Sequence, residues 1–274
     1  MPDLQYFSLK NKTALVTGAL GLLGKNHCEA LAEAGANVIV SDLNENECMN
    51  FANDLSERFN SKCSGMFLDI TDINSVQEMR AYISKQYAIL DVLVNNAGIN
   101  DAVENSQGIS ESSEFENYPL ELWNRSLNVN LTGVFLTCQK LGGLMKESGR
   151  GSIINIASTY GIVAPDQSVY LRPDGSRGFI KSPSYPVTKA GVIMLTKYLS
   201  VYWASSGVRV NSLSPGGVMN GQEQYFVENY SRRTPLGRMS MPDDYKGALI
   251  FLASDASSYM TGANLVVDGG WTAW

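Results

Sequence analysis

The sequence has few of the residues that build metal sites and disulfide frameworks. It contains four cysteines, scattered as Cys28, Cys48, Cys63 and Cys138 without a C-x-x-C pair, and a single histidine, His27. This spacing favours reduced thiols over disulfides or a zinc site, and we expect no bound metal. Because His27 falls within the first predicted helix, we interpret it as a structural residue.

Long apolar runs and an excess of positive charge are also absent. No apolar segment approaches the length that spans a membrane, and the N-terminus MPDLQYFSLKNK lacks the apolar core of a signal peptide. We therefore expect a soluble, cytoplasmic protein. The formal charge of -6 disfavours nucleic acid or an anionic membrane surface as the main partner.

Strand-like and helical patterns alternate along the whole chain, and no repeat, low-complexity tract or linker interrupts them. Apolar β-rich runs predict strands at 13–17, 37–42, 65–69, 91–98 (ending in a loop), 151–158, 208–214 and 264–270. Helical patterns cover 22–34, 45–60, 73–87, 119–147, 184–206, 221–233 (a short helical lid) and 242–253. Such βαβ alternation predicts an α/β fold of one domain: a doubly wound, Rossmann-type parallel sheet of about seven strands with helices on both faces.

A glycine-rich turn, TGALGLLG at 17–24, joins the first strand to the first helix. Glycines allow the backbone to approach a pyrophosphate, and the helix N-terminus offers free N–H groups to it. Asp42 ends the next strand, where a carboxylate can bind both hydroxyls of an adenosine ribose and repel a 2′-phosphate. Asp42 could instead cap the following helix. We favour ribose binding, and hence NAD over NADP.

The stretch SPSYPVTKAG, residues 182–191, places Tyr185 and Lys189 four residues apart and therefore on one helix face. A tyrosine hydroxyl normally has a pKa of about 10. A neighbouring ammonium favours the phenolate and lowers that pKa toward working pH. The pair is a candidate proton-transfer unit, although the same spacing also occurs by chance in ordinary surface helices.

An ordered set of motifs resembles the short-chain dehydrogenase/reductase superfamily from about Lys12 to Gly270. The set is the glycine turn, Asn95-Asn96-Ala97-Gly98, Asn130, Ser158, Tyr185 with Lys189, and Pro215-Gly216. Each motif alone is weak, but the ordered combination is highly specific. Within the superfamily, the segment before Tyr185 and the ending LVVDGGWTAW are loosely similar to gluconate 5-dehydrogenases and to dehydrogenases of flagellin-modification sugar pathways.

The resemblance implies a role for each catalytic position. Tyr185 is the general acid and base, Lys189 binds the nicotinamide ribose and lowers the tyrosine pKa, and Ser158 hydrogen-bonds the substrate oxygen. Asn130 kinks its helix and holds a water for proton relay. Structural alternatives remain, because Asn130 could bond only to backbone, Ser158 could cap its strand, and Asn95 and Asn96 could form a turn.

The resemblance also implies the cofactor contacts. Asn96, Ala97 and Gly98 pack against the adenine ribose, Asp69 and Ile70 flank the adenine, and the backbone at Val218 holds the carboxamide. The full implied set is Gly18, Gly21, Leu23, Gly24, Asp42, Asp69, Ile70, Asn96, Ala97, Gly98, Tyr185, Lys189, Pro215, Gly216 and Val218. Leu22 departs from the family pattern, which has glycine there, so we expect a narrower pyrophosphate turn.

We expect three loops, at about 99–118, 160–183 and 217–238, to determine the substrate. The insert 164–183 carries Arg172, Arg177 and Lys181 beside Tyr170 and Phe179. This basic and aromatic group could bind a carboxylate, a phosphate or a sugar ring, with Arg172 as the candidate contact. Alternatively, it is a solvated loop or a subunit contact. The same alternatives apply to Arg232 and Arg233.

The predicted reaction is NAD-dependent interconversion of a secondary alcohol and a ketone on a polyol, sugar acid or sugar nucleotide. One alternative is a 3-oxoacyl thioester reductase, a class that usually favours NADP. An alternative of another class is a non-catalytic NAD-binding regulatory module. The resemblance also implies a homotetramer or homodimer, with the helices at 119–147 and 184–206 packing across an interface.

Overall fold

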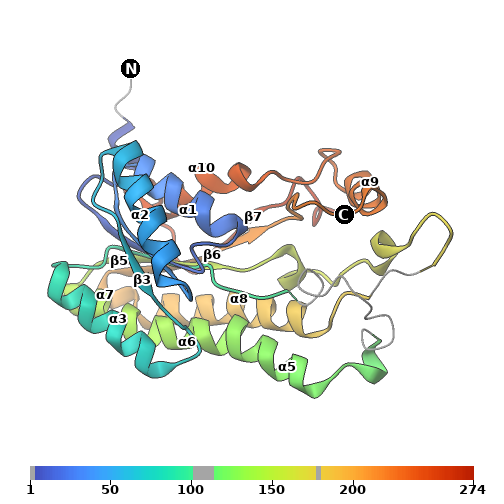
Figure 1. The fold of residues 1–274 in the computed structure, drawn as a ribbon, viewed down its shortest axis with the longest axis horizontal. Helices are drawn as coiled ribbons and strands as arrows, with labels where there is room; N and C mark the ends of the chain where they lie inside the picture. Colours follow the sequence, from blue (N-terminus) through green and yellow to red (C-terminus); the bar gives the residue numbers. More distant parts are fainter. Residues whose placement is uncertain (1–3, 101–113, 177–179) are drawn as a thin grey trace.

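A computed structural model describes residues 4–100, 114–176 and 180–274 (Figure 1). The predictions for Arg177, Phe179 and most of the 99–118 loop fall outside these residues. Within the described parts of the chain, no helix combines the length and apolar character needed to cross a bilayer.

The centre of the molecule is a seven-stranded parallel sheet in the order β3-β2-β1-β4-β5-β6-β7. The order changes direction between β1 and β4, the place where ligands bind in open α/β sheets. The predicted doubly wound fold is therefore confirmed. The strands are β1 Thr13–Thr17, β2 Asn37–Asp42, β3 Ser64–Phe67, β4 Val92–Asn95, β5 Gly151–Ile156, β6 Val208–Pro215 and β7 Asn264–Val267.

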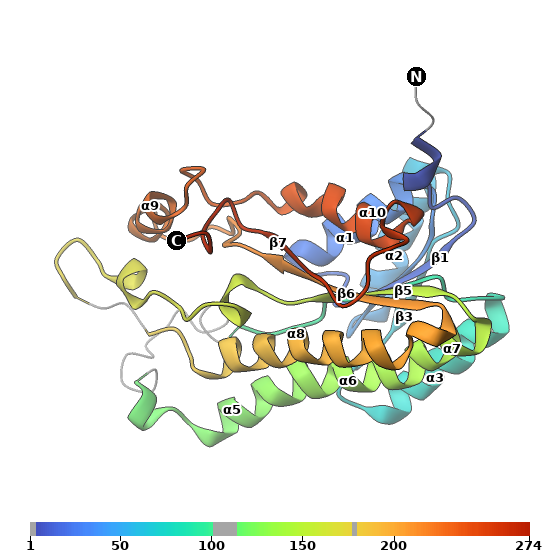
Figure 2. The same ribbon diagram turned by 180° about the vertical axis from the view of Figure 1, so that it is seen from behind.

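Two helical layers cover the sheet, one on each face (Figures 1 and 2). Side chains alternate across a strand, so in β1 Val16 packs into one core cluster and Leu15 into the other. Both clusters are apolar, which explains why the strands read as continuous hydrophobic runs. One layer is α1 Leu22–Glu33, α2 Glu45–Phe59 and α10 Lys246–Ala253; the other is α3 Ile73–Gln86, α8 Ser184–Tyr202 and the helical stretch 120–148.

The helical stretch 120–148 is interrupted twice by π-helical turns. Its segments are α5 Leu120–Leu127, α6 Val134–Thr137 and α7 Gly143–Ser148, with π turns at Asn128–Gly133 and Cys138–Gly142. Such wider turns frequently occur at functional sites. The family resemblance implied a kink at Asn130, and the structure has a π turn at that residue.

Helix ends differ from the predictions by a few residues. Asp72 caps α3 by accepting a hydrogen bond from Asn74 N at 2.9 Å. The predicted helix 184–206 ends earlier, at Tyr202, because a short 3₁₀ turn and Gly207, in the left-handed conformation, follow it. The predicted lid helix is α9 Gln224–Arg233, and it lies beside the C-terminus (Figure 1).

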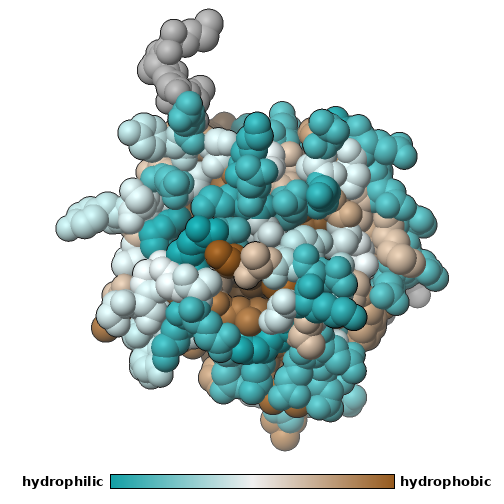
Figure 3. All heavy atoms as spheres, turned by 90° about the vertical axis from the view of Figure 1, so that its left-hand side faces the viewer, coloured by the Kyte–Doolittle hydropathy of each residue, from teal (hydrophilic) through white to brown (hydrophobic). Residues whose placement is uncertain are grey.

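The face where the strands begin is mainly polar, with a few apolar residues in a central hollow (Figure 3). At these strand starts Asp91 is buried, accepts a hydrogen bond from Thr13 N at 3.0 Å and lies 3.2 Å from the Arg150 guanidinium. The predicted site residues follow the other ends of the strands. The edge of the sheet where the strands begin therefore has a structural role, and the edge where they end is the candidate functional site.

Candidate active site

The glycine turn is crowded by backbone at two of its glycines. Gly18 has φ +60°, and a Cβ there would lie 2.6 Å from Ala97 Cα. A Cβ at Gly24 would lie 2.2 Å from Gly18 O, whereas one at Gly21 would lie 3.3 Å from the same oxygen. No side chain caps α1 at Gly21. A backbone packed this closely before an uncapped helix start fits a pyrophosphate.

The two leucines of the turn point in different directions. Leu23 packs against the core cluster of α1 and α2, so only its backbone faces the turn. The side chain of Leu22 is 40% exposed at the first position of α1. A narrower pyrophosphate turn at Leu22 stays a prediction.

Asp42 ties the end of β2 to the glycine turn. Its Oδ2 accepts a hydrogen bond from Leu20 N at 2.9 Å, and its Oδ1 accepts one from Leu43 N at 2.7 Å. The alternative role as a helix cap is wrong, because Asn44 caps α2. A carboxylate has about four acceptor positions, so capacity remains for ribose hydroxyls.

Asn96 holds the loop after β4 against the glycine turn. Its amide nitrogen donates to Thr17 O at 3.0 Å and to Gly18 O at 2.8 Å. The backbone N–H groups of Asn96 and Ala97 both donate to Thr17 Oγ1 at 3.1 Å. The side-chain nitrogen of Asn96 is thus engaged with the turn, and the ribose contacts of Asn96, Ala97 and Gly98 stay a prediction.

Asn95 is a buried strand residue rather than a turn former, so that alternative is wrong. Its amide nitrogen donates to Asn155 Oδ1 at 2.8 Å, and Thr137 Oγ1 donates to its Oδ1 at 2.7 Å. Asn155 in turn donates to Thr196 Oγ1 at 2.9 Å. This polar chain links β4, β5 and two helices, and sequence reasoning missed it. The sequence did carry a signal for this network. Each of the two apolar strands contains an asparagine, and a buried side-chain amide requires hydrogen-bond partners.

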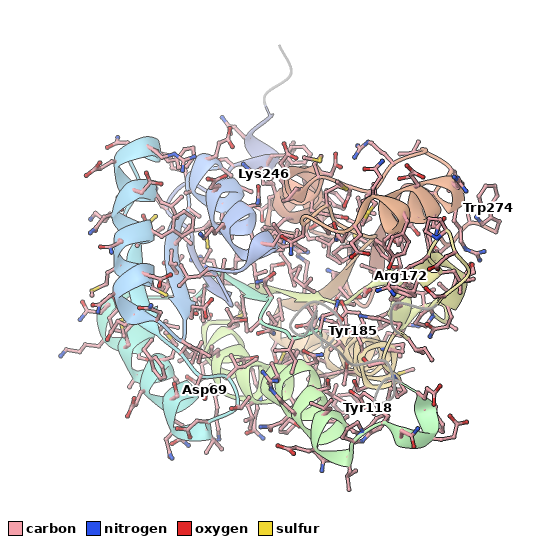
Figure 4. All side chains as sticks on the ribbon, turned by 45° about the vertical axis from the view of Figure 1, so that its right-hand side comes forward. Asp69, Tyr118, Arg172, Tyr185, Lys246 and Trp274 are labelled. Atoms are coloured by element: carbon pink, nitrogen blue, oxygen red, sulfur yellow. The ribbon has the colours of Figure 1, made fainter. Side chains whose placement is uncertain are left out.

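The two residues expected at the adenine differ in their surroundings. Asp69 Oδ1 accepts hydrogen bonds from Thr71 N at 2.8 Å and Thr71 Oγ1 at 2.7 Å. The side chain of Ile70 is buried against Gly133, so adenine contacts would use its backbone. Figure 4 shows Asp69 well apart from Tyr185, as the two ends of a dinucleotide require.

Tyr185 and Ser158 meet at the end of β5. Ser158 is buried directly after this strand, and its hydroxyl accepts a hydrogen bond from Tyr160 N at 3.1 Å. Desolvation raises the pKa of Tyr185 above its ordinary value, while its hydrogen bond with Ser158 lowers it. Ser158 thus both caps a short 3₁₀ turn and contacts Tyr185.

Lys189 is buried near the Tyr185 ring. Its Nζ donates to Ile156 O at 2.8 Å and lies 5.8 Å from the centroid of the Tyr185 ring. Burial lowers the pKa of Lys189 to about 8. The sequence predicted a lowered pKa for Tyr185, but the net shift is upward, because desolvation outweighs the favourable contacts.

Asn130 pins the loop after β4 to α8. Its Oδ1 accepts a hydrogen bond from Ile99 N at 2.7 Å, and its amide nitrogen donates to Ile99 O at 3.0 Å and Thr188 Oγ1 at 3.4 Å. The side chain of Asn130 therefore bonds to the hydroxyl of Thr188 as well as to backbone groups. The water predicted on Asn130 stays a prediction.

The turn after β6 is positioned by β7 and α9. Gly216 N donates to Val267 O at 2.9 Å, and Gly217 N donates to Tyr230 Oη at 2.7 Å. The carbonyl of Val218 accepts a hydrogen bond from Gln222 Nε2 at 2.7 Å. The predicted carboxamide contact at Val218 would therefore have to share or replace this bond.

Comparison with known proteins agrees with this arrangement. A family model described as Enoyl-(Acyl carrier protein) reductase matches residues 18–272. The D-threitol dehydrogenase of Mycolicibacterium smegmatis is 34% identical over 271 residues, which cover 97% of this chain and 95% of that protein. The chain belongs to the short-chain dehydrogenase/reductase superfamily. It is therefore an oxidoreductase that acts on CH–OH groups, as the resemblance implied.

Two solved structures of this superfamily superpose over nearly the whole chain. A gluconate 5-dehydrogenase from Burkholderia cenocepacia, in complex with NADP and tartrate, has a TM-score of 0.86 and 30% identity and covers 99% of both chains. A short chain dehydrogenase from Leptospira borgpetersenii with bound NAD+ has a TM-score of 0.84 and 34% identity, covering 99% of this chain and 96% of that chain. The predicted likeness to gluconate 5-dehydrogenases is confirmed.

An aromatic cluster forms one wall beside Tyr185 in this short-chain dehydrogenase/reductase. The rings of Tyr230 and Trp271 stack with their centroids 4.1 Å apart, and the ring centroids of Tyr170 and Phe226 are 5.2 Å apart. Tyr185 packs against this cluster. The sequence indicated Tyr170, but it missed Trp271, because residues so far apart in the chain give no local signal.

The basic residues of the insert and of α9 have different environments. Arg172 is exposed on the insert, on the same side of the molecule as Tyr185 (Figure 4). The Arg233 guanidinium forms an ion pair with the Asp166 carboxylate, with an N–O distance of 2.8 Å, and its Cζ lies 5.4 Å from the ring centroid of Trp271. The side chain of Arg232 is exposed. Both α9 arginines line a cavity of about 600 Å³ with Asp166, Ser168, Val169, Asn229 and Trp274.

Proposed function

We propose that this oxidoreductase interconverts a secondary alcohol and a ketone with NAD(H), on a polyol, sugar acid or sugar nucleotide. The observation that carries the proposal is the position of the buried Lys189 ammonium, which donates to Ile156 O and lies 5.8 Å from the centroid of the Tyr185 ring, beside Ser158 after β5. The crowded glycine turn follows β1 and Asp42 ends β2, at the same edge of the sheet, where a dinucleotide fits.

Each side chain has a defined task in alcohol oxidation. The phenolate of Tyr185 takes the proton of the substrate hydroxyl, and Ser158 donates a hydrogen bond to the same oxygen. Lys189 binds the nicotinamide ribose and, together with the water expected on Asn130, returns the proton to solvent. The nicotinamide supplies the chemistry of accepting hydride from the substrate carbon. In ketone reduction Tyr185 donates the proton instead.

Asp42 supports NAD over NADP. Its carboxylate stands at the end of β2, and its hydrogen bond from Leu20 fixes it beside the glycine turn. A 2′-phosphate there would face a fixed negative charge. Both cofactors occur among the similar structures, so the preference belongs to this residue rather than to the fold.

Replacing Asp42 should therefore raise the relative use of NADP. We expect Asp42→Asn to increase the NADP-to-NAD ratio of kcat/KM by about tenfold or more, since like charges in contact cost several kcal/mol. Asparagine keeps an acceptor for Leu20 N, so it separates loss of charge from loss of the turn; Asp42→Ala removes both. Steady-state kinetics with both cofactors measure the ratio, and an unchanged ratio would show that Asp42 does not bind the ribose.

The substrate is tested by a screen of purified enzyme. Polyols, sugar acids, sugar nucleotides and 3-oxoacyl thioesters are each assayed with NAD(H) and NADP(H). The proposal expects turnover with the hydroxylated compounds and NAD(H). Turnover confined to thioesters with NADPH would favour the reductase alternative, and no turnover in the whole panel would favour a regulatory module.

We also propose a homotetramer or homodimer that buries α8 and the adjoining helical stretch. Met194, Tyr198, Val201 and Tyr202 form an exposed apolar stripe on α8, with Val201 81% exposed. Helix α8, which carries the stripe, lies on the near side of the molecule in Figure 2. The four unpaired cysteines further support a reducing, cytoplasmic location.

This surface predicts a change of oligomeric state on mutation. We expect Val201→Glu to shift the assembly to monomers or smaller oligomers, because a charge would be buried at the contact. Light scattering after size exclusion measures the mass. Met49→Glu, at an exposed residue of α2 in the opposite helical layer, is the control. An unchanged mass for Val201→Glu would place the interface elsewhere.

A further inference from the structure

A second lysine lies closer to Tyr185 than Lys189 does. Lys181 Nζ is 4.1 Å from the centroid of the Tyr185 ring, compared with 5.8 Å for Lys189 Nζ. Lys181 is only 4% exposed. From the sequence alone, the insert that contains it could also have been a solvated loop. A cation over an aromatic face is attracted by the ring electrons, and a phenolate ring adds negative charge to that attraction.

Two loops fix this ammonium in place. Gln167 holds the backbone of Lys181 on both sides, accepting from its N–H at 2.9 Å and donating to its carbonyl at 3.3 Å. The Nζ donates to Asn100 Oδ1, and Asn100 follows Ile99, which Asn130 pins. The loop after β4 and the insert after β5 therefore converge on one cation.

Within residues 4–100, 114–176 and 180–274, the other titratable groups that face Tyr185 add no opposing charge. Tyr160 and Tyr170 come from the loop after β5, and burial raises the pKa of both, so they remain neutral phenols at neutral pH. Lys189 faces the ring from α8 itself. Among the described residues near the ring, both charges are thus positive, one from the insert and one from the helix.

We propose that Lys181 acts on Tyr185 as a second cation, which stabilises the phenolate from the face of the ring. The proposal rests on the proposed function, in which Tyr185 exchanges the proton. Lys181 is a positioning residue that works through Tyr185, and it need not touch the substrate. Through Lys181 the insert contributes to acid–base catalysis. The positive charge of Lys181 offsets the desolvation that disfavours the Tyr185 phenolate.

Loss of this cation should raise the pKa of Tyr185. We expect Lys181→Met to raise it by about one unit, because an opposite charge within 4–6 Å typically shifts a pKa by 1–3 units. Lys181→Arg should leave the pKa within a few tenths of a unit. Asn100→Ala removes one hydrogen-bond partner of Lys181 but keeps the cation, so it should shift the pKa less than Lys181→Met.

Two measurements follow the pKa. One is the pH dependence of kcat/KM for alcohol oxidation. The other is the ultraviolet titration of tyrosinate without substrate, each variant being compared with the same variant carrying Tyr185→Phe, so that only Tyr185 contributes to the difference. If Lys181→Met fails to fold, Lys181→Gln replaces it, because glutamine also removes the charge and can still donate to Asn100.

The outcomes distinguish three cases. A raised pKa in both measurements supports the proposal. An unchanged pKa with a lower melting temperature means that Lys181 only holds the loops, and a selective loss of activity on carboxylate-bearing alcohols means that it is a substrate ligand; each result overturns the proposal. Normal turnover by Tyr185→Phe would refute the proposed function, whereas the substrate-free titration would still report the effect of Lys181 on the tyrosine.

Discussion

Tyr185→Phe is expected to lower turnover by about 10²–10⁴-fold or more, while cofactor affinity and folding survive. The substitution removes one hydroxyl and leaves the ring in contact with the aromatic cluster. Ser158 keeps its hydrogen bond from Tyr160 N, so the strand end should stay in place. Steady-state rates measure the chemistry, and fluorescence titration with NADH measures binding.

Ser158→Ala is the matched control, because it removes the partner hydroxyl but retains the acid–base group. It should cost less than Tyr185→Phe and should raise the pKa of Tyr185, since the hydrogen bond with Ser158 lowers it. Oxidation requires the phenolate, so kcat/KM of the native enzyme should rise with pH and level off above the pKa. A Tyr185→Phe rate within tenfold of the native rate would show that another group moves the proton.

Gly24→Ala is expected to weaken dinucleotide binding by about 10- to 100-fold, since overpacking costs roughly 1–3 kcal/mol. The added Cβ would lie 2.2 Å from Gly18 O and 2.8 Å from the backbone of Ala19. Backbone atoms cannot rotate away as a flexible side chain can. The turn must therefore shift, together with the helix start that would face the pyrophosphate.

Gly21→Ala provides a control within the same turn. Its Cβ would meet only Gly18 O, at 3.3 Å, which requires a shift of a few tenths of an ångström. We expect affinity near that of the native protein. Calorimetric titration with NADH gives both dissociation constants, and thermal unfolding shows whether either variant is merely destabilised. Native affinity for both variants in folded protein would place the phosphates outside this turn.

The two variants of Asp42 and the variants of Lys181 address different halves of the site. Asp42 lies at the adenosine end, where charge selects the cofactor, and Lys181 lies at the tyrosine, where charge sets a proton affinity. A change at one end should leave the other unaffected. A cofactor preference altered by Lys181→Met would indicate coupling between the ends through the loop after β4.

The sequence by itself determined the fold class, the strand positions and the superfamily. Helix and strand follow from the local spacing of apolar residues, and the turn before α1 follows from its glycines, so neighbouring residues are sufficient to predict them. The order of Ser158, Tyr185 and Lys189 along the chain placed the candidate site. These features depend on short stretches of sequence and little on how distant elements pack.

Only the tertiary structure decided how those residues interact. It turned the amide of Asn96 toward the glycine turn, joined Asn95 to Asn155 across two strands, and placed Lys181 over the ring of Tyr185. It also reversed the expected shift in the pKa of Tyr185, because desolvation depends on every group packed around the hydroxyl. Distances between side chains on different elements and the loss of water around them arise from packing, which local sequence patterns do not encode.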